Sequence, residues 1–229
     1  MDPEELLYLA PLSYFFGAWL GDGWFHANPM TRQYNCGIST SDKEIVTRCY
    51  LRVSKFFTDL PKASFQEQND PRANVTMYSC RWFGKDFADL LYILTNDKQK
   101  LPEYIWKVSQ EYQLEMLAGL MDTDGSIMRQ KNAGTRTGYA YYMNFGGTRG
   151  FVREVPALFN AVGIKVGKIT VDAGRKVGYL PFTRFYIPLQ SAVEHGFYFR
   201  CNRKMQRLQD YVHKFTDLKV YNAPDDGMD

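Results

Sequence analysis

Two apolar stretches of the chain read as versions of one another. Residues 15–23, Phe-Phe-Gly-Ala-Trp-Leu-Gly-Asp-Gly, and residues 117–125, Leu-Ala-Gly-Leu-Met-Asp-Thr-Asp-Gly, both end in Asp-Gly. Apolar runs of this length are typical of buried helices, and residues four apart share one face of a helix. Small residues occupy such positions: Gly17, Gly21, Gly119 and Thr123. We expect the glycine that ends each run to close its helix in a left-handed conformation.

Elsewhere polar and less polar residues alternate, which marks strands with one face on a core and the other in solvent. The predicted strands are 24–28, 33–40, 63–68, 75–83, 126–131, 139–147, 167–172 and 183–189. The further predicted helices are 45–53, 85–94, 112–121, 151–159 and 203–215. The pattern repeats with an offset of 102 residues, from Gly23 to Gly125. We therefore predict an α+β pseudo-dimer of two αββαββα halves, residues 1–105 and residues 106–229, the second with a short acidic tail.

The two small-residue faces can pack closely and bring Asp22 and Asp124 together. Two unit charges about 4 Å apart repel by roughly 4 kcal/mol at an effective dielectric of 20. The negative ends of the two helices add to this cost. A divalent cation would remove it, and hard oxygen ligands suit Mg²⁺ or Ca²⁺ better than zinc.

These stretches resemble the paired motifs of the single-chain LAGLIDADG homing endonucleases. The second copy departs from the family name at two positions only, and the first has Leu20 where the motif has its first aspartate. The second aspartate, the family's catalytic carboxylate, is present in both copies as Asp22 and Asp124. The resemblance spans about residues 12–215.

The resemblance implies a monomer whose halves carry antiparallel-sheet saddles that lie along a long double-stranded DNA site. It implies an endonuclease that hydrolyses both strands with a divalent cation. The cation, Mg²⁺ with Ca²⁺ or Mn²⁺ as substitutes, would be held by Asp22, Asp124 and the main-chain carbonyls of Gly21 and Thr123. The same fold also serves as an RNA maturase that binds intron RNA, and as a DNA-binding regulator without cleavage. Both aspartates are kept together with candidate lysines, which favours the nuclease.

Many two-motif members carry a lysine near the cleavage site, where its charge can stabilise the phosphorus transition state. In the first half Lys98 and Lys100 both fit this position, and the spacing does not separate them. In the second half Lys204 fits best, with Arg203 as the alternative. Asp122 lies two residues from Asp124, so it points to another face of the helix, and we interpret it as structural.

The predicted strands carry amide and basic groups on their polar faces. Such groups can make paired hydrogen bonds to base edges in the major groove. The candidates for base contact are Gln33, Asn35, Gln66, Gln68, Lys168, Thr170, Arg184 and Tyr186. Cations predicted to lie in loops and to contact phosphates are Arg32, Arg72, Arg129, Lys131, Arg136 and Lys176.

Composition adds little to this interpretation. The net charge of +3 permits nucleic-acid binding without arguing for it. The four cysteines lack CxxC spacing and the three histidines are scattered, which argues against a structural zinc site and fits a reducing compartment. No signal peptide and no apolar run of membrane-spanning length is recognisable. We therefore expect an intracellular protein.

Overall fold

The computed structural model describes residues 4–28, 30, 33–59, 63–70, 74–131, 139–173 and 180–215. A 3₁₀ turn, η1 (Leu7–Leu12), precedes the first half, whose elements are α1 (Ser13–Asp22), β1 (Gly23–Asn28), β2 (Gln33–Thr40), α2 (Lys43–Phe56), β3 (Ser64–Asp70), β4 (Val75–Phe83) and α3 (Lys85–Thr95). After η2 (Glu103–Trp106) come α4 (Gln110–Thr123), β5 (Ser126–Lys131), β6 (Tyr139–Gly147), η3 (Gly150–Arg153), α5 (Val155–Ala161), β7 (Thr170–Asp172), β8 (Phe182–Pro188), α6 (Leu189–Glu194) and α7 (Asn202–Phe215).

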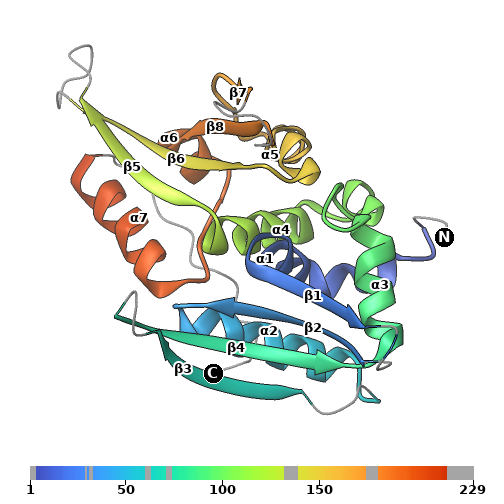
Figure 1. Cartoon of the computed structure of the whole chain (residues 1–229). Coiled ribbons are helices and arrows are strands. Elements are labelled where there is room, and N and C mark those ends of the chain that lie inside the picture. Colours follow the sequence, from blue (N-terminus) through green and yellow to red (C-terminus); the bar gives the residue numbers. More distant parts are fainter. Residues whose placement is uncertain are drawn as a thin grey trace.

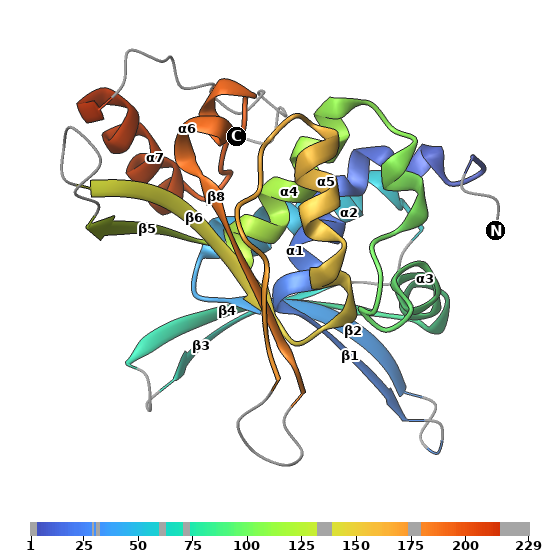
Figure 2. The same cartoon turned by 90° about the horizontal axis from the view of Figure 1, so that it is seen from above.

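Two four-stranded antiparallel sheets have the same strand order, β1-β2-β4-β3 in the first half and β5-β6-β8-β7 in the second. Helices α1 and α4 lie side by side between them (Figure 1). Seen from above, the strand pairs spread away from this helix pair on one side of the molecule, and the other helices lie mainly on the opposite side (Figure 2). The predicted α+β fold of two pseudo-symmetric halves around a central two-helix interface is confirmed.

One continuous hydrophobic core joins both halves. It runs from the residues before α1 to the last helix, and its largest fully buried side chains include Trp19, Trp82, Tyr14 and Tyr104. The apolar runs at 15–20 and 116–121 are buried because the two motif helices pack against each other and each is covered by further elements, α1 by β1, β2 and α2 and α4 by α5 and η2. All four cysteines are buried free thiols. No helix in the described part of the chain is long and apolar enough to cross a membrane.

The second half differs from the prediction at its C-terminal end. We predicted a strand over 183–189, but Pro188 ends β8, and Leu189–Glu194 form the short helix α6. Six residues are too few to reveal a helical period. Helix α6 follows β8 as α3 follows β4, so α7 is an additional element and not the counterpart of α3.

The glycines that end the two motifs do not adopt the left-handed conformation that we expected. Gly23 has φ −74° and ψ 155°, an extended conformation that leads directly from α1 into β1. Gly125 is likewise absent from the glycines with positive φ in the described chain. Close packing explains these glycines instead, because a Cβ on Gly23 would lie 2.2 Å from Trp19 O and one on Gly125 would lie 2.6 Å from Met121 O.

Candidate active site

The motif helices meet through the small residues that the sequence predicted. A Cβ atom on Gly17 or Gly119 would overlap the backbone of the opposite helix. Where the helices end, a Cβ on Gly21 would lie 2.1 Å from Thr123 Oγ1 and 3.2 Å from Asp124 Oδ2. The Asp124 carboxylate therefore lies directly against the last turn of α1, which ends at Asp22.

The surroundings of these two carboxyl groups disfavour their charged forms. Burial raises the pKa of Asp22, and a hydrogen bond from Thr40 and the charge of Lys204 lower it in part. The Asp124 side chain reaches solvent, but the protein packed around it, followed by the charge of Asp22, raises its pKa to about 6. When burial and mutual repulsion disfavour the charged forms of two neighbouring carboxyl groups, a cation placed between them stabilises both carboxylates.

Two lysines hold equivalent places beside the carboxylates. Lys98 Nζ donates to the carbonyl oxygens of Gly21 (3.2 Å) and Gly23 (2.5 Å) at the end of α1. Lys204 Nζ donates to the carbonyl oxygens at the end of α4, which are Met121 (2.8 Å), Asp122 (2.6 Å), Thr123 (3.3 Å) and Gly125 (2.7 Å). The 102-residue offset relates Gly21 to Thr123 and Gly23 to Gly125. A cation at a helix C-terminus also interacts favourably with the helix dipole.

Burial lowers the pKa of both lysines, to about 8 for Lys98, where the charge of Arg149 adds to the effect. At Lys98 the charges of Asp124 and Asp22 act in the opposite direction. Both lysines thus respond electrostatically to the acidic groups at the helix ends, and the four side chains form one cluster.

The other two candidates for the lysine positions lie outside this cluster. Lys100 is an exposed side chain whose Nζ pairs with Glu103 at 2.6 Å, so the structure does not bring it into the cluster as it does Lys98. Arg203 pairs with Asp42 at 2.9 Å on the surface. The turn after α3 decides between Lys98 and Lys100, because residues 96–98 all have left-handed φ values (46°, 52° and 62°). Asn96 and Asp97 belong to the non-glycine residue types that adopt this conformation most often, but a third left-handed residue at Lys98 is rare and is not indicated by the sequence.

Asp122 has the structural role that we predicted, and the contacts define it. Its Oδ2 accepts hydrogen bonds from Tyr14 Oη and from the backbone N–H groups of Arg200 and Cys201, each at 3.0 Å. These two amides directly precede α7, which carries Lys204. Asp122 thereby fixes the start of α7 against the end of α4, and complete burial raises its pKa to about 7.

A buried ion network that the sequence did not reveal lies farther along α4. Glu115 pairs with Arg52 of α2 at 2.6 Å and with Arg200 on its other oxygen, and Tyr198 Oη donates to the same carboxylate. The Arg52 guanidinium also lies over the ring of Tyr14, at 5.2 Å. The network links α2 of the first half to α4 and Arg200 of the second.

The strand register puts most of the predicted base-contacting residues on the outer faces of the sheets. On β2 the side chains of Cys36 and Ile38 face the core, so Gln33 and Asn35 face outward. Gln66 and Gln68 share this face. In the strand register Gln66 lies opposite Ser79 and Ser79 lies opposite Ser39, which faces outward as Asn35 does. In the second sheet Phe185 and Ile187 face the core, and the outward residues are Thr170, Arg184 and Tyr186.

The remaining cations are placed differently. Arg129 and Lys131 belong to strand β5 and not to a loop. Arg129 lies opposite Tyr141 in the strand register, on the face of the sheet that α7 covers. Lys168 is exposed but precedes β7. Arg32, Arg72, Arg136 and Lys176 lie outside the described residues.

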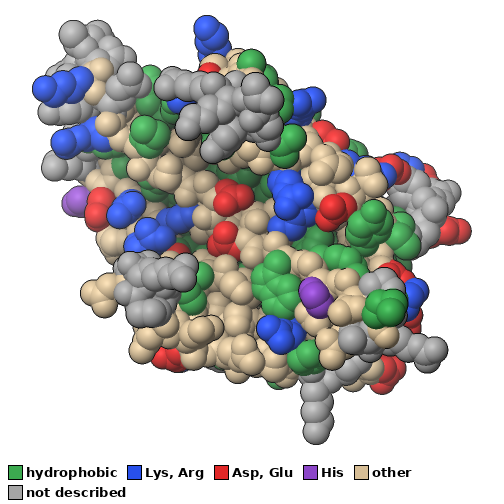
Figure 3. Space-filling view, viewed as in Figure 1, with side chains coloured by type: hydrophobic (Ala, Val, Ile, Leu, Met, Phe, Trp, Pro, Cys, Tyr) green, Lys and Arg blue, Asp and Glu red, His purple; other side chains and the backbone are tan. Residues whose placement is uncertain are grey.

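In the space-filling view, acidic side chains occupy the middle of the face between the sheets, and Lys and Arg side chains flank them (Figure 3).

Comparison with known proteins supports the same fold. No protein-family model matches the sequence, and no curated protein matches it. Among solved structures, a mesophilic variant of the homing endonuclease I-DmoI has a TM-score of 0.56 at 15% identity, over 82% of this chain and 94% of that one. I-DmoI in complex with DNA and Ca gives 0.54 at 15% identity, over 95% of each chain. The homing endonuclease I-WcaI bound to its DNA recognition sequence gives 0.53 at 14% identity, over 86% of this chain and 85% of that one. The resemblance to the single-chain LAGLIDADG endonucleases is thus confirmed at the level of the fold.

Proposed function

Starting from the LAGLIDADG fold, we propose that this protein is a site-specific endonuclease that cuts both strands of a long double-stranded DNA target as a monomer. One observation carries the proposal. Asp22 and Asp124 end two abutting helices, each helix end is capped by a lysine, and the cluster lies between two sheets with polar outer faces. A protein that only bound DNA or intron RNA would gain nothing from keeping two like charges together.

The donor atoms at the helix ends fit a hard divalent cation. Asp22 and Asp124 would hold it, and the absence of a side chain at Gly21 lets Thr123 and Asp124 pack directly against the end of α1. The carbonyls of Gly21 and Thr123 already accept N–H groups from the lysines, so each has one further lone pair to offer. Structures of I-DmoI with DNA have been determined with Ca and with Mn. When bound, Mg²⁺ would supply Lewis-acid stabilisation of the charge that develops on the phosphate.

The chain's own residues would position the DNA and complete the charge balance. Lys98 and Lys204 are held rigidly by backbone carbonyls, so their positive charges are already oriented beside the carboxylates before DNA arrives. The two-fold relation of the lysines matches the two-fold relation of the strands of a duplex. Each half would therefore serve one strand, and the outer face of each sheet would contact one half-site.

The experiment that tests this function needs no knowledge of the target. The protein is incubated with a pooled library of randomised duplex DNA and Mg²⁺, and double-strand ends are mapped by sequencing. We expect ends that gather at one long sequence and that disappear when EDTA replaces Mg²⁺. A library left intact at every protein concentration would contradict the proposal.

A further inference from the structure

A tryptophan and an arginine meet on the outer face of the first sheet, over a glycine. Gly37 of β2 is the register partner of both Trp24 in β1 and Arg81 in β4. A Cβ on Gly37 would lie 2.5 Å from Trp24 Cζ2, so only glycine lets the indole lie across the strand. The Arg81 guanidinium carbon lies 5.2 Å from the centre of the Trp24 ring, within the range of a cation–π contact.

The stack holds Arg81 in a fixed position. Trp24 Nε1 donates to Ser39 Oγ at 3.0 Å, which anchors the indole. Within the described part of the chain no carboxylate pairs with Arg81, and its Nε is buried without a hydrogen-bond partner. By contrast, Arg184 on the second sheet lies 3.6 Å from Asp172. A half-buried arginine that is oriented but unpaired is ready to bind an external acceptor.

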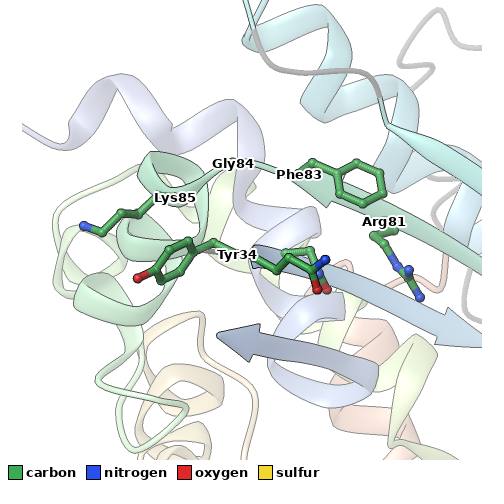
Figure 4. Close-up of a pocket in the computed structure, with 7 residues that line it drawn as sticks. Tyr34, Arg81, Phe83, Gly84 and Lys85 are labelled. Carbon is green, nitrogen blue, oxygen red and sulfur yellow. The ribbon is translucent and has the colours of Figure 1, made fainter. Parts of the chain in front are cut away.

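The space beside the stack is suited to a base edge. A hollow of about 770 Å³ is lined by Gln33, Asn35, Arg81 and Phe83, among other residues. Arg81 and Phe83 project from β4 on the same side of the sheet (Figure 4). The lining thus combines a guanidinium, two amides and an aromatic ring, on the face that would meet DNA.

We propose that Arg81 is a specificity-determining residue that reads a guanine in the major groove of the first half-site. Arginine binds the O6 and N7 atoms of guanine with two parallel hydrogen bonds, and no other base offers that pair of acceptors. Fixing the side chain on Trp24 beforehand reduces the entropy lost on binding. The proposal rests on the proposed function.

The geometry also limits where this guanine lies. Trp24 follows Asp22 by two residues, about 7 Å along the strand. The backbone of Arg81 is two strand spacings from that of Trp24, about 10 Å across the sheet, and its guanidinium reaches back to 5.2 Å from the centre of the Trp24 ring. At about 3.4 Å per base pair, the guanine would therefore lie within a few base pairs of the cut.

The test compares base preferences. Cleavage of a library carrying all four bases at every target position is measured for the wild type, Arg81→Ala, Arg81→Lys, Trp24→Leu and Lys85→Ala. Lys85 is a matched control because it lines the same hollow but pairs with Asp89 at 2.7 Å. We expect the wild type to prefer guanine by about 5- to 150-fold at one position near the cut. Arg81→Ala should lose this preference at that position alone, Arg81→Lys and Trp24→Leu should weaken it, and Lys85→Ala should retain it.

The outcomes separate this inference from the proposed function. If the wild type cuts and Arg81→Ala keeps every base preference, Arg81 does not read a base although the protein is a nuclease. If Arg81→Ala weakens cleavage of all sequences equally, Arg81 contacts a phosphate, and the inference is also wrong. A wild type that cuts no member of the library would remove the proposed function, and this inference with it.

Discussion

Gly17 and Gly119 make the same contact from opposite sides of the helix crossing. A Cβ on Gly17 would lie 2.1 Å from Met116 O, and a Cβ on Gly119 would lie 2.2 Å from Tyr14 O. The offset of 102 residues relates Gly17 to Gly119 (119 minus 17) and Tyr14 to Met116 (116 minus 14). In both places the obstacle is backbone, which cannot move aside without separating the helices. The distance between the active-site carboxylates therefore depends on these two glycines.

Replacing Gly119 by alanine should destabilise the protein. In an isolated helix Gly→Ala is favourable by about 1 kcal/mol, but overpacking a tight contact costs about 1–3 kcal/mol and occasionally more. We expect a net loss of stability in urea denaturation, together with loss of DNA cleavage. Gly147→Ala is the control, since its added Cβ would meet only Val152 Cγ2 at 3.2 Å. An unchanged denaturation midpoint for Gly119→Ala would show that the helices are not packed so closely.

The carboxylates can be tested without changing their shape. Asp22→Asn or Asp124→Asn removes one negative charge from the cation site, and we expect double-strand cleavage in Mg²⁺ to be abolished. Binding of the target in Ca²⁺ should persist, because the outer faces of the sheets are untouched. Asp89→Asn, at a surface ion pair with Lys85, serves as the matched substitution and should cut normally. Full cleavage by either motif variant would rule out the assigned carboxylates.

The sequence predicts those parts of the fold that depend on local pattern. The motif helices, their small faces and the alternation of Gln33 and Asn35 with Cys36 all follow from residues close together in the chain. Lys204 also follows, because the family resemblance fixes its place at the start of the last helix.

Features that depend on backbone conformation or on register between strands do not follow from the sequence. Lys98 and Lys100 are two residues apart, and only the left-handed turn at 96–98 turns the first toward α1 and leaves the second in solvent. The contact of Trp24 with Arg81 requires the register of three strands, two of them separated by helix α2. Neither the left-handed turn nor the strand register can be predicted from hydrophobic periodicity.

Asp122 should tolerate asparagine but not leucine, the residue that the first motif has at this position. Asparagine can still accept hydrogen bonds from the amides of Arg200 and Cys201, and it resembles the protonated acid that burial favours. Leucine would leave these buried donors unpaired, at about 1–3 kcal/mol for each. We expect Asp122→Leu to lower stability and to slow cutting of the strand that depends on Lys204, leaving nicked product. Equal effects of the two substitutions on stability and nicking would contradict this role.

The Glu115 network predicts a dependence of stability on pH. Burial by itself would raise the pKa of Glu115, but Arg52 and Arg200 outweigh it and hold the pKa below its ordinary value of 4.5. The unfolded state therefore binds this proton more readily than the folded state, so the stabilisation is complete above pH 4.5 and is lost as pH falls below it. Glu115→Gln leaves two buried guanidinium groups without a counter-charge and should cost roughly 3–5 kcal/mol at pH 7. Urea denaturation at pH 7 and pH 4 should show the difference from the wild type shrinking at the lower pH, and a constant difference would argue against the ion pairs.

Affinity for DNA should fall steeply as salt rises. The net charge is only +3, so attraction would come from cations gathered on the face between the sheets and not from the molecule as a whole. Each phosphate contact contributes a slope of about −0.9 to the plot of log affinity against log salt, and six to ten contacts reduce affinity by about 10³–10⁵ between 50 and 200 mM. The measurement is fluorescence anisotropy of a labelled target at constant Ca²⁺, which avoids cleavage. Asp22→Asn, which lacks one central charge, should keep the same slope, since it removes no phosphate contact. A flat response in the wild type would mean that the protein does not follow the DNA backbone, and the saddle would then need another ligand.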